Sequence, residues 1–308
     1  MKWLGIGLKL VHYFRNGVTR TGIVDKGLIF DLQDAAEKLE LPIPREGAAI
    51  DRILSDGVLP SLRQASERMI GNVPGVPVES VRLLSPVLNP EKILLMAVNY
   101  HSHSKEQKVK PPSEPHLFTK FRNALIGPGE PILIPKVSKK VDWEVELAVI
   151  IGKTGKYIPK KDAMSYVAGY AISNDVSFRD FQFSTQLPHG KTTLGLNWVK
   201  GKGLDSSFPL GPWLVTKDEI QDPQGLEISL SVNGKTMQRS NTGDMVFKID
   251  SLIEYVSAGI TLKPGDIIST GTPEGVATFT GQPFLKDGDM VEASIERIGT
   301  LRNPVKAE

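Results

Sequence analysis

The spacing of apolar residues separates a short N-terminal part of the chain from a longer part with a different pattern. Residues 9–31 form short apolar runs on either side of Asn16-Gly17, a dipeptide that favours a β-hairpin turn. Over residues 32–70 the apolar positions recur at helical intervals. Residues 71–90 are rich in proline, which indicates an extended connection. We therefore predict a small N-terminal α/β domain over residues 1–85.

The rest of the chain has mainly the pattern of β-strands. The strand candidates are residues 93–98, 132–134, 143–151, 167–172, 228–232 and 291–296. Asn233-Gly234 follows one of them and predicts a second hairpin. Ser251 and Glu254 have capping-box spacing, which predicts a short helix behind them. We therefore predict that residues 86–308 form a larger domain and that the fold is mainly β, of the α+β class.

Composition and charge exclude several classes of protein. Of the 308 residues, 40% are hydrophobic and 23% are charged, as in ordinary globular proteins. The net charge is only +2 and there is no basic block, which argues against nucleic-acid binding. The absence of cysteine excludes disulfides and thiolate sites. Because the sequence shows neither a membrane-spanning apolar run nor a secretory leader, we expect a cytoplasmic protein with no membrane partner.

Two glutamates stand at the start of a strongly apolar strand candidate. Side chains at positions i and i+2 share a face of a strand, so Glu144 and Glu146 would lie about 7 Å apart on one face. Residues 147–151 beyond them are apolar. Burying carboxylates is costly unless a cation or hydrogen-bond donors meet them. From this pattern alone, a solvated strand end is the alternative to a binding site.

A third carboxylate follows another apolar strand candidate, which runs into Asn174-Asp175. Carboxylates from adjoining strands suit a hard cation such as Mg²⁺ or Mn²⁺, which prefers oxygen ligands. Zinc is disfavoured, because neither cysteine nor an HxxxH motif accompanies the acids. Glu144, Glu146 and Asp175 are therefore candidate metal ligands.

His103 and Glu106 are a candidate catalytic pair. Their i, i+3 spacing brings them together if the segment is helical. A carboxylate can hold an imidazole in its basic tautomer, ready to deprotonate water. Two alternatives remain at this point: a surface contact, or a strand on which His101 and His103 would be metal ligands.

Taken together and in order, these clusters resemble the fumarylacetoacetate hydrolase family. The matching stretches are Ala97-Val98-Asn99-Tyr100 with His103 and Glu106, then residues 118–120, 141–153, 168–170, 174–182, 201–202, 208–212, 233–234 and 269–276. The resemblance covers residues 90–306 and is specific because so many motifs occur in the family's order. Within the family, the chain is similar to the proteins described as fumarylacetoacetate hydrolase domain-containing.

The resemblance implies a fold of layered mixed β-sheets, a homodimer, and a small 2-oxo acid as substrate. It implies that Glu144, Glu146 and Asp175 hold Mg²⁺ or Mn²⁺, and that His103 and Glu106 lie on a short helix over the site. It assigns the remaining site residues by motif: Lys202 as a cationic catalytic residue, and Arg179, Gln182, Thr272, Tyr100 and Lys120 as substrate contacts. The chain departs from the family pattern at Gly203-Leu204 and in a longer segment 183–200 with His189 and Lys191, near the substrate end.

These residues suggest a reaction through an enolate. A 2-oxo acid offers a carboxylate oxygen and a keto oxygen in one plane to an octahedral cation, which would act as a Lewis acid on the keto oxygen. Lys202 would add positive charge there, and Arg179 would bind a distal carboxylate.

Because this whole set of residues is present (His103, Glu106, Arg179 and Lys202), we expect cleavage of a C–C bond, by an acylpyruvate-type hydrolase or an oxaloacetate decarboxylase. The alternative is a keto–enol tautomerase or isomerase of oxaloacetate or a dienoic diacid on the same metal. A third hypothesis is a metal-binding protein of this fold without catalytic activity.

Overall fold

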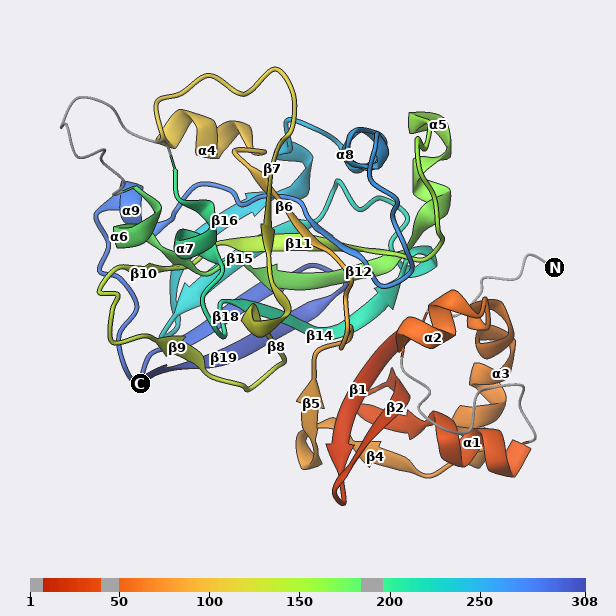
Figure 1. Cartoon of the computed structure of the whole chain (residues 1–308). Coiled ribbons are helices and arrows are strands. Elements are labelled where there is room, and N and C mark those ends of the chain that lie inside the picture. Colours follow the sequence, from red (N-terminus) through yellow and green to blue (C-terminus); the bar gives the residue numbers. More distant parts are fainter. Residues whose placement is uncertain (1–7, 40–49, 184–195) are drawn as a thin grey trace.

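The N-terminal part forms an antiparallel β-layer with three helices beside it (Figure 1). The computed structural model describes residues 8–39, 50–183 and 196–308. The elements here are β1 (Lys9–Arg15), β2 (Val18–Asp25), β3 (Leu28–Asp31), β4 (Gly75–Pro77), β5 (Arg82–Leu84), α1 (Leu32–Leu39), α2 (Ile50–Ser55) and α3 (Leu59–Asn72). Asn16 and Gly17 have positive φ angles of 51° and 82°, as the predicted hairpin turn requires. The strands and helices predicted in these described residues are confirmed.

A mixed sheet of twelve strands is the centre of the described structure, in the order β4-β3-β2-β1-β14-β12-β11-β17-β6-β7, with β5 beside β1 and β8 beside β14. Its further strands are β6 (Ile93–Ala97), β7 (His116–Lys120), β8 (Leu125–Ile126), β11 (Val145–Ile151), β12 (Val167–Asn174), β14 (Phe208–Thr216) and β17 (Ile267–Ser269). The central strand β11 lies antiparallel between β12 and β17, and all of its residues are buried. This burial on both faces explains why its sequence is continuously apolar beyond Glu146.

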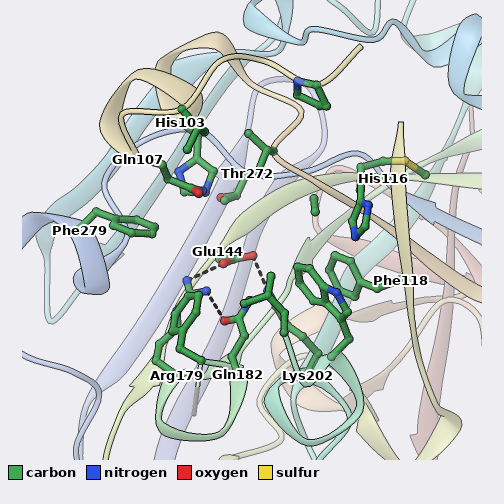
Figure 2. Close-up of a pocket in the computed structure, with 18 of the residues that line it drawn as sticks. His103, Gln107, His116, Phe118, Glu144, Arg179, Gln182, Lys202, Thr272 and Phe279 are labelled. Carbon is green, nitrogen blue, oxygen red and sulfur yellow. Dashed lines mark hydrogen bonds and ion pairs between the residues drawn. The ribbon is translucent and has the colours of Figure 1, made fainter. Parts of the chain in front are cut away.

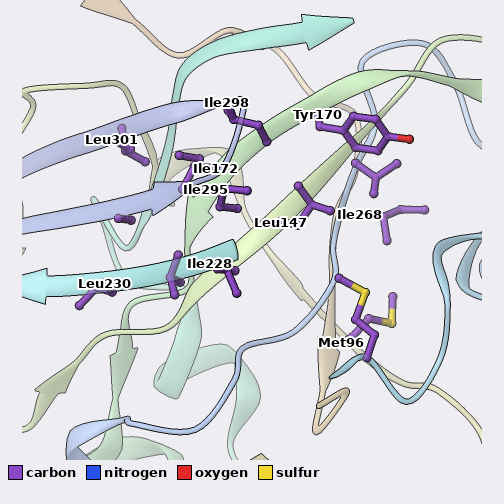
Figure 3. Close-up of a cluster of buried hydrophobic side chains, with 14 of the residues drawn as sticks. Met96, Leu147, Tyr170, Ile172, Ile228, Leu230, Ile268, Ile295, Ile298 and Leu301 are labelled. Carbon is purple, nitrogen blue, oxygen red and sulfur yellow. The ribbon is translucent and has the colours of Figure 1, made fainter. Parts of the chain in front are cut away.

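A five-stranded sheet packs against one face of the central sheet. Its order is β16 (Lys235–Asn241), β15 (Glu227–Val232), β18 (Met290–Ile295), β19 (Gly299–Ala307) and β9 (Ile132–Ile134), while β10 (Val141–Asp142) and β13 (Ser177–Phe178) form a separate ribbon. Leu147 of β11 belongs to the same buried cluster as Ile228 and Ile295 of this sheet (Figure 3). The predicted fold class of layered mixed sheets is therefore confirmed.

The opposite face of the central sheet joins the N-terminal part to the rest of the molecule. Ala148 and Ile150 belong to the same buried cluster as Leu62 and Met69 of α3. In addition, β1 pairs with β14, with Lys9 opposite Val215. The central sheet therefore continues across the predicted boundary near residue 85, and the division into domains 1–85 and 86–308 stays a prediction.

The remaining helices are α4 (His101–Glu106), α5 (Lys160–Ala163), α6 (Arg179–Gln182), α7 (Trp198–Lys202), α8 (Ile249–Ser257) and α9 (Ala277–Thr280). The predicted capping box at Ser251 is wrong, because α8 begins two residues earlier and Lys248 stands at its N-cap. The buried Ile249 extends the apolar face of the helix toward its N-terminus. No helix in the described ranges is both long and apolar enough to cross a membrane.

Candidate active site and metal centre

Strands β11 and β12 bring three carboxylates together. Glu144 directly precedes β11, Glu146 is its second residue, and Asp175 directly follows β12. The Asp175 backbone N–H donates to the Glu144 carbonyl oxygen at 2.8 Å, which aligns the two strand ends. One oxygen from each carboxylate lies within 4.8 Å of the others, and the three residues are only 6%, 1% and 0% exposed. A solvated strand end is therefore excluded.

Two cations meet the carboxylate of Glu144 (Figure 2). Arg179 Nη2 donates to Glu144 Oε1 at 2.5 Å, and Lys202 Nζ donates to Glu144 Oε2 at 2.8 Å. Lys202 Nζ also donates to Asp175 Oδ2 at 2.5 Å, so one ammonium bridges two carboxylates. Burial opposes ionisation of Glu144, but Lys202 and Arg179 outweigh it and hold the pKa of Glu144 below its usual range.

The carboxylate of Glu146 is only half satisfied. Its Oε2 accepts hydrogen bonds from Ser269 Oγ at 2.5 Å and from the Gly271 N–H at 3.0 Å. Gly271 has a φ of 90°, and a Cβ there would lie 2.9 Å from the Asn99 Cβ, so this approach requires glycine. Its Oε1 is buried with no hydrogen-bond partner among the described residues. Burial, and then the charges of Asp175 and Glu144, raise the pKa of Glu146.

Lys120 supports Asp175 from behind the site. Its Nζ lies 3.0 Å from Asp175 Oδ1, outside hydrogen-bond geometry, and donates instead to Val176 O at 2.8 Å and Ser207 O at 2.8 Å. Burial is the main cause that lowers the pKa of Lys120 to about 8. Burial also raises the pKa of Asp175, against the opposing effect of Lys202 and Lys120. Asp175 Oδ1 is thus a second buried oxygen without a hydrogen bond.

These carboxylates fit a hard divalent cation. The donor set consists of oxygen atoms alone, and Glu146 Oε1 lacks a hydrogen-bond donor where an unpaired buried acceptor is costly, while Asp175 Oδ1 faces only the ammonium of Lys120. Glu144, Glu146 and Asp175 would hold the ion. The alternative with His101 and His103 as ligands on a strand is wrong, because both residues lie on α4 and His101 is exposed.

The helix α4 carries the predicted His–Glu pair. His103 Nδ1 lies 2.9 Å from Glu106 Oε2, and His103 is only 5% exposed, so the pair is not a surface contact. The Gly275 N–H donates to Glu106 Oε1 at 2.8 Å and ties the helix to the loop before α9. Gln107, which the sequence analysis missed, places its amide Nε2 2.6 Å from His103 Nε2. Its position one helical turn after His103 was the available signal.

A cavity of about 290 Å³ joins these parts. Of the predicted site residues, His103, Glu144, Arg179, Gln182, Lys202 and Thr272 line it. The lining residues that the sequence analysis did not single out include Gln107, His116, Phe118, Trp198 and Phe279. Phe118 and Trp198 stack with ring centroids 4.6 Å apart and form an apolar wall.

Some predicted residues lie behind the cavity wall or outside the described residues. Glu146 and Asp175 lie beneath Glu144, and Glu106 lies behind His103. Tyr100 is fully buried in the core, and neither Tyr100 nor Lys120 lines the cavity, so their contact with substrate stays a prediction. His189 and Lys191 fall outside the described residues.

Comparison with known proteins identifies the family. Residues 92–306 match the family model described as fumarylacetoacetate (FAA) hydrolase C-terminal. The chain belongs to the fumarylacetoacetate hydrolase family. It is 49% identical over 234 residues to the Bos taurus mitochondrial oxaloacetate tautomerase FAHD2A, covering 76% of this chain and 72% of that one. It is 45% identical over 246 residues to the Homo sapiens protein of the same name, covering 80% and 76%. The predicted family membership is confirmed.

Solved structures of family members have the same fold. A maleylpyruvate hydrolase from Sphingobium sp. SYK-6, in complex with manganese(II) and pyruvate, superposes with a TM-score of 0.78 at 32% identity, covering 97% of this chain and 99% of that one. A probable 2-hydroxyhepta-2,4-diene-1,7-dioate isomerase from Mycobacterium abscessus has a TM-score of 0.78 at 30% identity, covering 98% and 99%. The protein is therefore an enzyme of a family that includes tautomerases, isomerases and hydrolases.

Proposed function

We propose that the protein is a divalent-metal-dependent tautomerase that interconverts the enol and keto forms of oxaloacetate or a related small 2-oxo diacid. The observation that carries this proposal is the 45–49% identity to proteins named oxaloacetate tautomerase. From the sequence we expected a hydrolase or decarboxylase, with a keto–enol tautomerase as the alternative. This proposal adopts that alternative. The manganese(II) in the related maleylpyruvate hydrolase supports the metal.

The charges in the cavity wall suit a small dianion. Arg179 and Lys202 both line the cavity and are paired with Glu144, and a divalent cation on the carboxylates would leave their positive charges to a bound dianion. A divalent cation held by Glu144, Glu146 and Asp175 would supply Lewis acidity that stabilises an enolate. The Thr272 hydroxyl donates to Val145 O at 2.9 Å and accepts from Gln238 Nε2 at 2.9 Å, so its position in the wall is fixed.

His103 is positioned to move the proton. Because the Glu106 carboxylate can only accept a hydrogen bond, His103 Nδ1 carries the proton in this pair and Nε2 keeps its lone pair on the cavity side. In tautomerisation, Nε2 takes the proton from the enol oxygen, and the imidazolium so formed returns a proton to C3. One proton leaves and one arrives, so no water is consumed.

A second candidate function is hydrolysis of acylpyruvates. The similarity to maleylpyruvate hydrolase and the buried His103–Glu106 pair favour it. The same imidazole nitrogen would then deprotonate a water molecule that attacks the distal acyl carbon.

A substrate panel distinguishes these functions. The enol-to-keto conversion of oxaloacetate, its decarboxylation, and the hydrolysis of acetylpyruvate and fumarylpyruvate are measured with Mg²⁺, Mn²⁺ and EDTA. We expect tautomerisation to be fastest with a metal, and His103→Ala to slow it by about 10²-fold or more. The exposed His101→Ala on the same helix is the control and should retain full activity. If the wild-type enzyme hydrolyses acylpyruvates but does not accelerate tautomerisation, the proposal is wrong.

We also propose a cytoplasmic homodimer, as expected from the sequence. Light scattering tests the dimer, and fractionation of the source cells tests the location. The names of several relatives contain the word mitochondrial. Recovery of the protein in the mitochondrial fraction would therefore contradict the proposed location.

A further inference from the structure

The side-chain amide of Gln107 is hydrogen-bonded to Nε2 of His103, the nitrogen that would act as the base. Gln107 directly follows α4, and its backbone N–H donates to His103 O at 3.0 Å, which fixes the residue one turn after His103. Its side chain lines the cavity and faces the same space as His103 (Figure 2). Since His103 Nδ1 donates to Glu106, His103 Nε2 is an acceptor, and the Gln107 amide Nε2–H donates to it at 2.6 Å.

Apart from Gln107, the neighbours of His103 offer no second donor to this nitrogen among the described residues. The ring of Phe279 lies edge-on to the imidazole with centroids 5.9 Å apart, and His103 is 5% exposed. On the cavity side, the Thr272 hydroxyl already donates to Val145 O. The Gln107 amide therefore already occupies Nε2, the atom that would have to take the proton of a hydrolytic water.

The two candidate reactions make different demands on this position. In tautomerisation, the enol hydroxyl of the substrate can exchange with the flexible amide as the single donor to Nε2. In hydrolysis, a water molecule must stay between Nε2 and the substrate while its oxygen bonds to the distal acyl carbon. Nε2 takes the water proton, the C–C bond breaks, and its electron pair forms the pyruvate enolate, which is then protonated. The amide competes with that water.

We propose that Gln107 is a positioning residue that determines the reaction of this enzyme, because its amide excludes the hydrolytic water from His103 Nε2 and thereby favours tautomerisation. This inference rests on the proposed tautomerase function. It concerns the ratio of two reactions at one site, so it can fail while the proposed function stands.

The test compares Gln107→Met and Gln107→Ala with the wild type. Methionine keeps the length of the side chain without an amide, and alanine also opens space for water. We expect the ratio of kcat/KM for acetylpyruvate hydrolysis to kcat/KM for oxaloacetate tautomerisation to rise about 10-fold in Gln107→Met, the factor that matches the loss of one neutral hydrogen bond. The rise should be larger in Gln107→Ala and should come from kcat for hydrolysis. Lys105→Met, on the exposed side of α4, is the matched control with an unchanged ratio.

Nuclear magnetic resonance tests the hydrogen bond between Gln107 and His103 independently of turnover. The ¹⁵N chemical shift of His103 Nε2 should change in Gln107→Met and stay unchanged in Lys105→Met, while far-ultraviolet circular dichroism remains that of the wild type. An unchanged activity ratio in both Gln107 variants, or an equal loss of both activities, would overturn the inference. Failure of the proposed function is recognised separately, by the absence of tautomerase activity in the wild type.

Discussion

Two buried polar clusters in this protein differ in how completely their acceptors are satisfied. In the N-terminal part, Asp31 accepts from Arg20 Nε at 2.6 Å, from Arg20 Nη2 at 2.7 Å, from the Asp34 N–H at 2.9 Å and from the Tyr13 hydroxyl. In the same part of the chain, His12 Nε2 accepts from the Ile50 N–H at 3.1 Å, and Nδ1 lies 3.0 Å from the Thr21 hydroxyl. Both acceptor groups have their donors within the same part of the chain.

The cluster at the ends of β11 and β12 is incomplete by comparison. Glu146 Oε1 and Asp175 Oδ1 are buried without a hydrogen bond, and burial raises the pKa of both groups. Asp175 Oδ1 still has the ammonium of Lys120 at 3.0 Å, whereas Glu146 Oε1 is left unpaired at an energetic cost, and such groups concentrate at functional sites. The contrast teaches that the N-terminal cluster is complete within the fold, whereas the carboxylate cluster has an acceptor that the proposed divalent cation would complete.

The largest expected effect comes from Glu146→Gln. The change removes one metal-binding oxygen, so turnover should fall by at least about 10²-fold and calorimetry should show weakened Mn²⁺ binding. In EDTA, the free energy of unfolding should stay the same or increase, because a buried charge with a raised pKa is removed. Glu227→Gln, at an exposed position, is the control. Unchanged Mn²⁺ affinity would show that the ligand assignment is wrong.

The next effect is on stability and comes from Asp31→Asn. Loss of the carboxylate leaves the guanidinium of Arg20 and the Tyr13 hydroxyl without their charged acceptor, which should lower the free energy of unfolding by about 3 kcal/mol. Urea denaturation measures it, and activity per folded molecule should not change. Asp34→Asn alters a 56% exposed partner of the same arginine and should cost less than about 1 kcal/mol. Equal costs for the two variants would contradict the role given to burial.

The smallest effect is a pH dependence that originates at His12. Burial lowers the pKa of His12 to about 4, below the value of about 6.5 in an unfolded chain. Between these values the unfolded state binds more protons, so the contribution of His12 is fully present above pH 6.5 and is lost as the pH falls toward 4. Between pH 7 and pH 5 the loss should be about 2 kcal/mol.

Comparison of the wild type with His12→Gln isolates that contribution. Glutamine can donate and accept as neutral histidine does, but it does not titrate. Urea denaturation at pH 7 and pH 5 should therefore show a smaller loss of stability in the variant, by about 2 kcal/mol. Parallel pH profiles for the two proteins would mean that His12 is not a buried neutral group.

Local patterns predicted the pieces of the site but not how they meet. The i, i+2 spacing of Glu144 and Glu146 and the i, i+3 spacing of His103 and Glu106 indicated shared faces, because strand and helix periodicity is a property of a few neighbouring residues. The apolar strand candidate that runs into Asn174-Asp175 added Asp175, and the family motif added Lys202. None of these signals indicated that Lys202 bridges Glu144 and Asp175, since that contact joins residues from distant parts of the chain.

The sequence by itself determined that the three acids lie at the ends of apolar strands. It also determined the hairpins at Asn16-Gly17 and Asn233-Gly234, and the family. Only the tertiary structure decided which polar atoms are satisfied. Lys120 became a buried support for Asp175 instead of a residue of the cavity wall, and Tyr100 became part of the core. The Gly275 N–H, far along the chain, donates to Glu106 and ties α4 to the loop before α9. Burial and hydrogen bonding depend on segments far apart in the chain, so they are fixed only when the sheets pack.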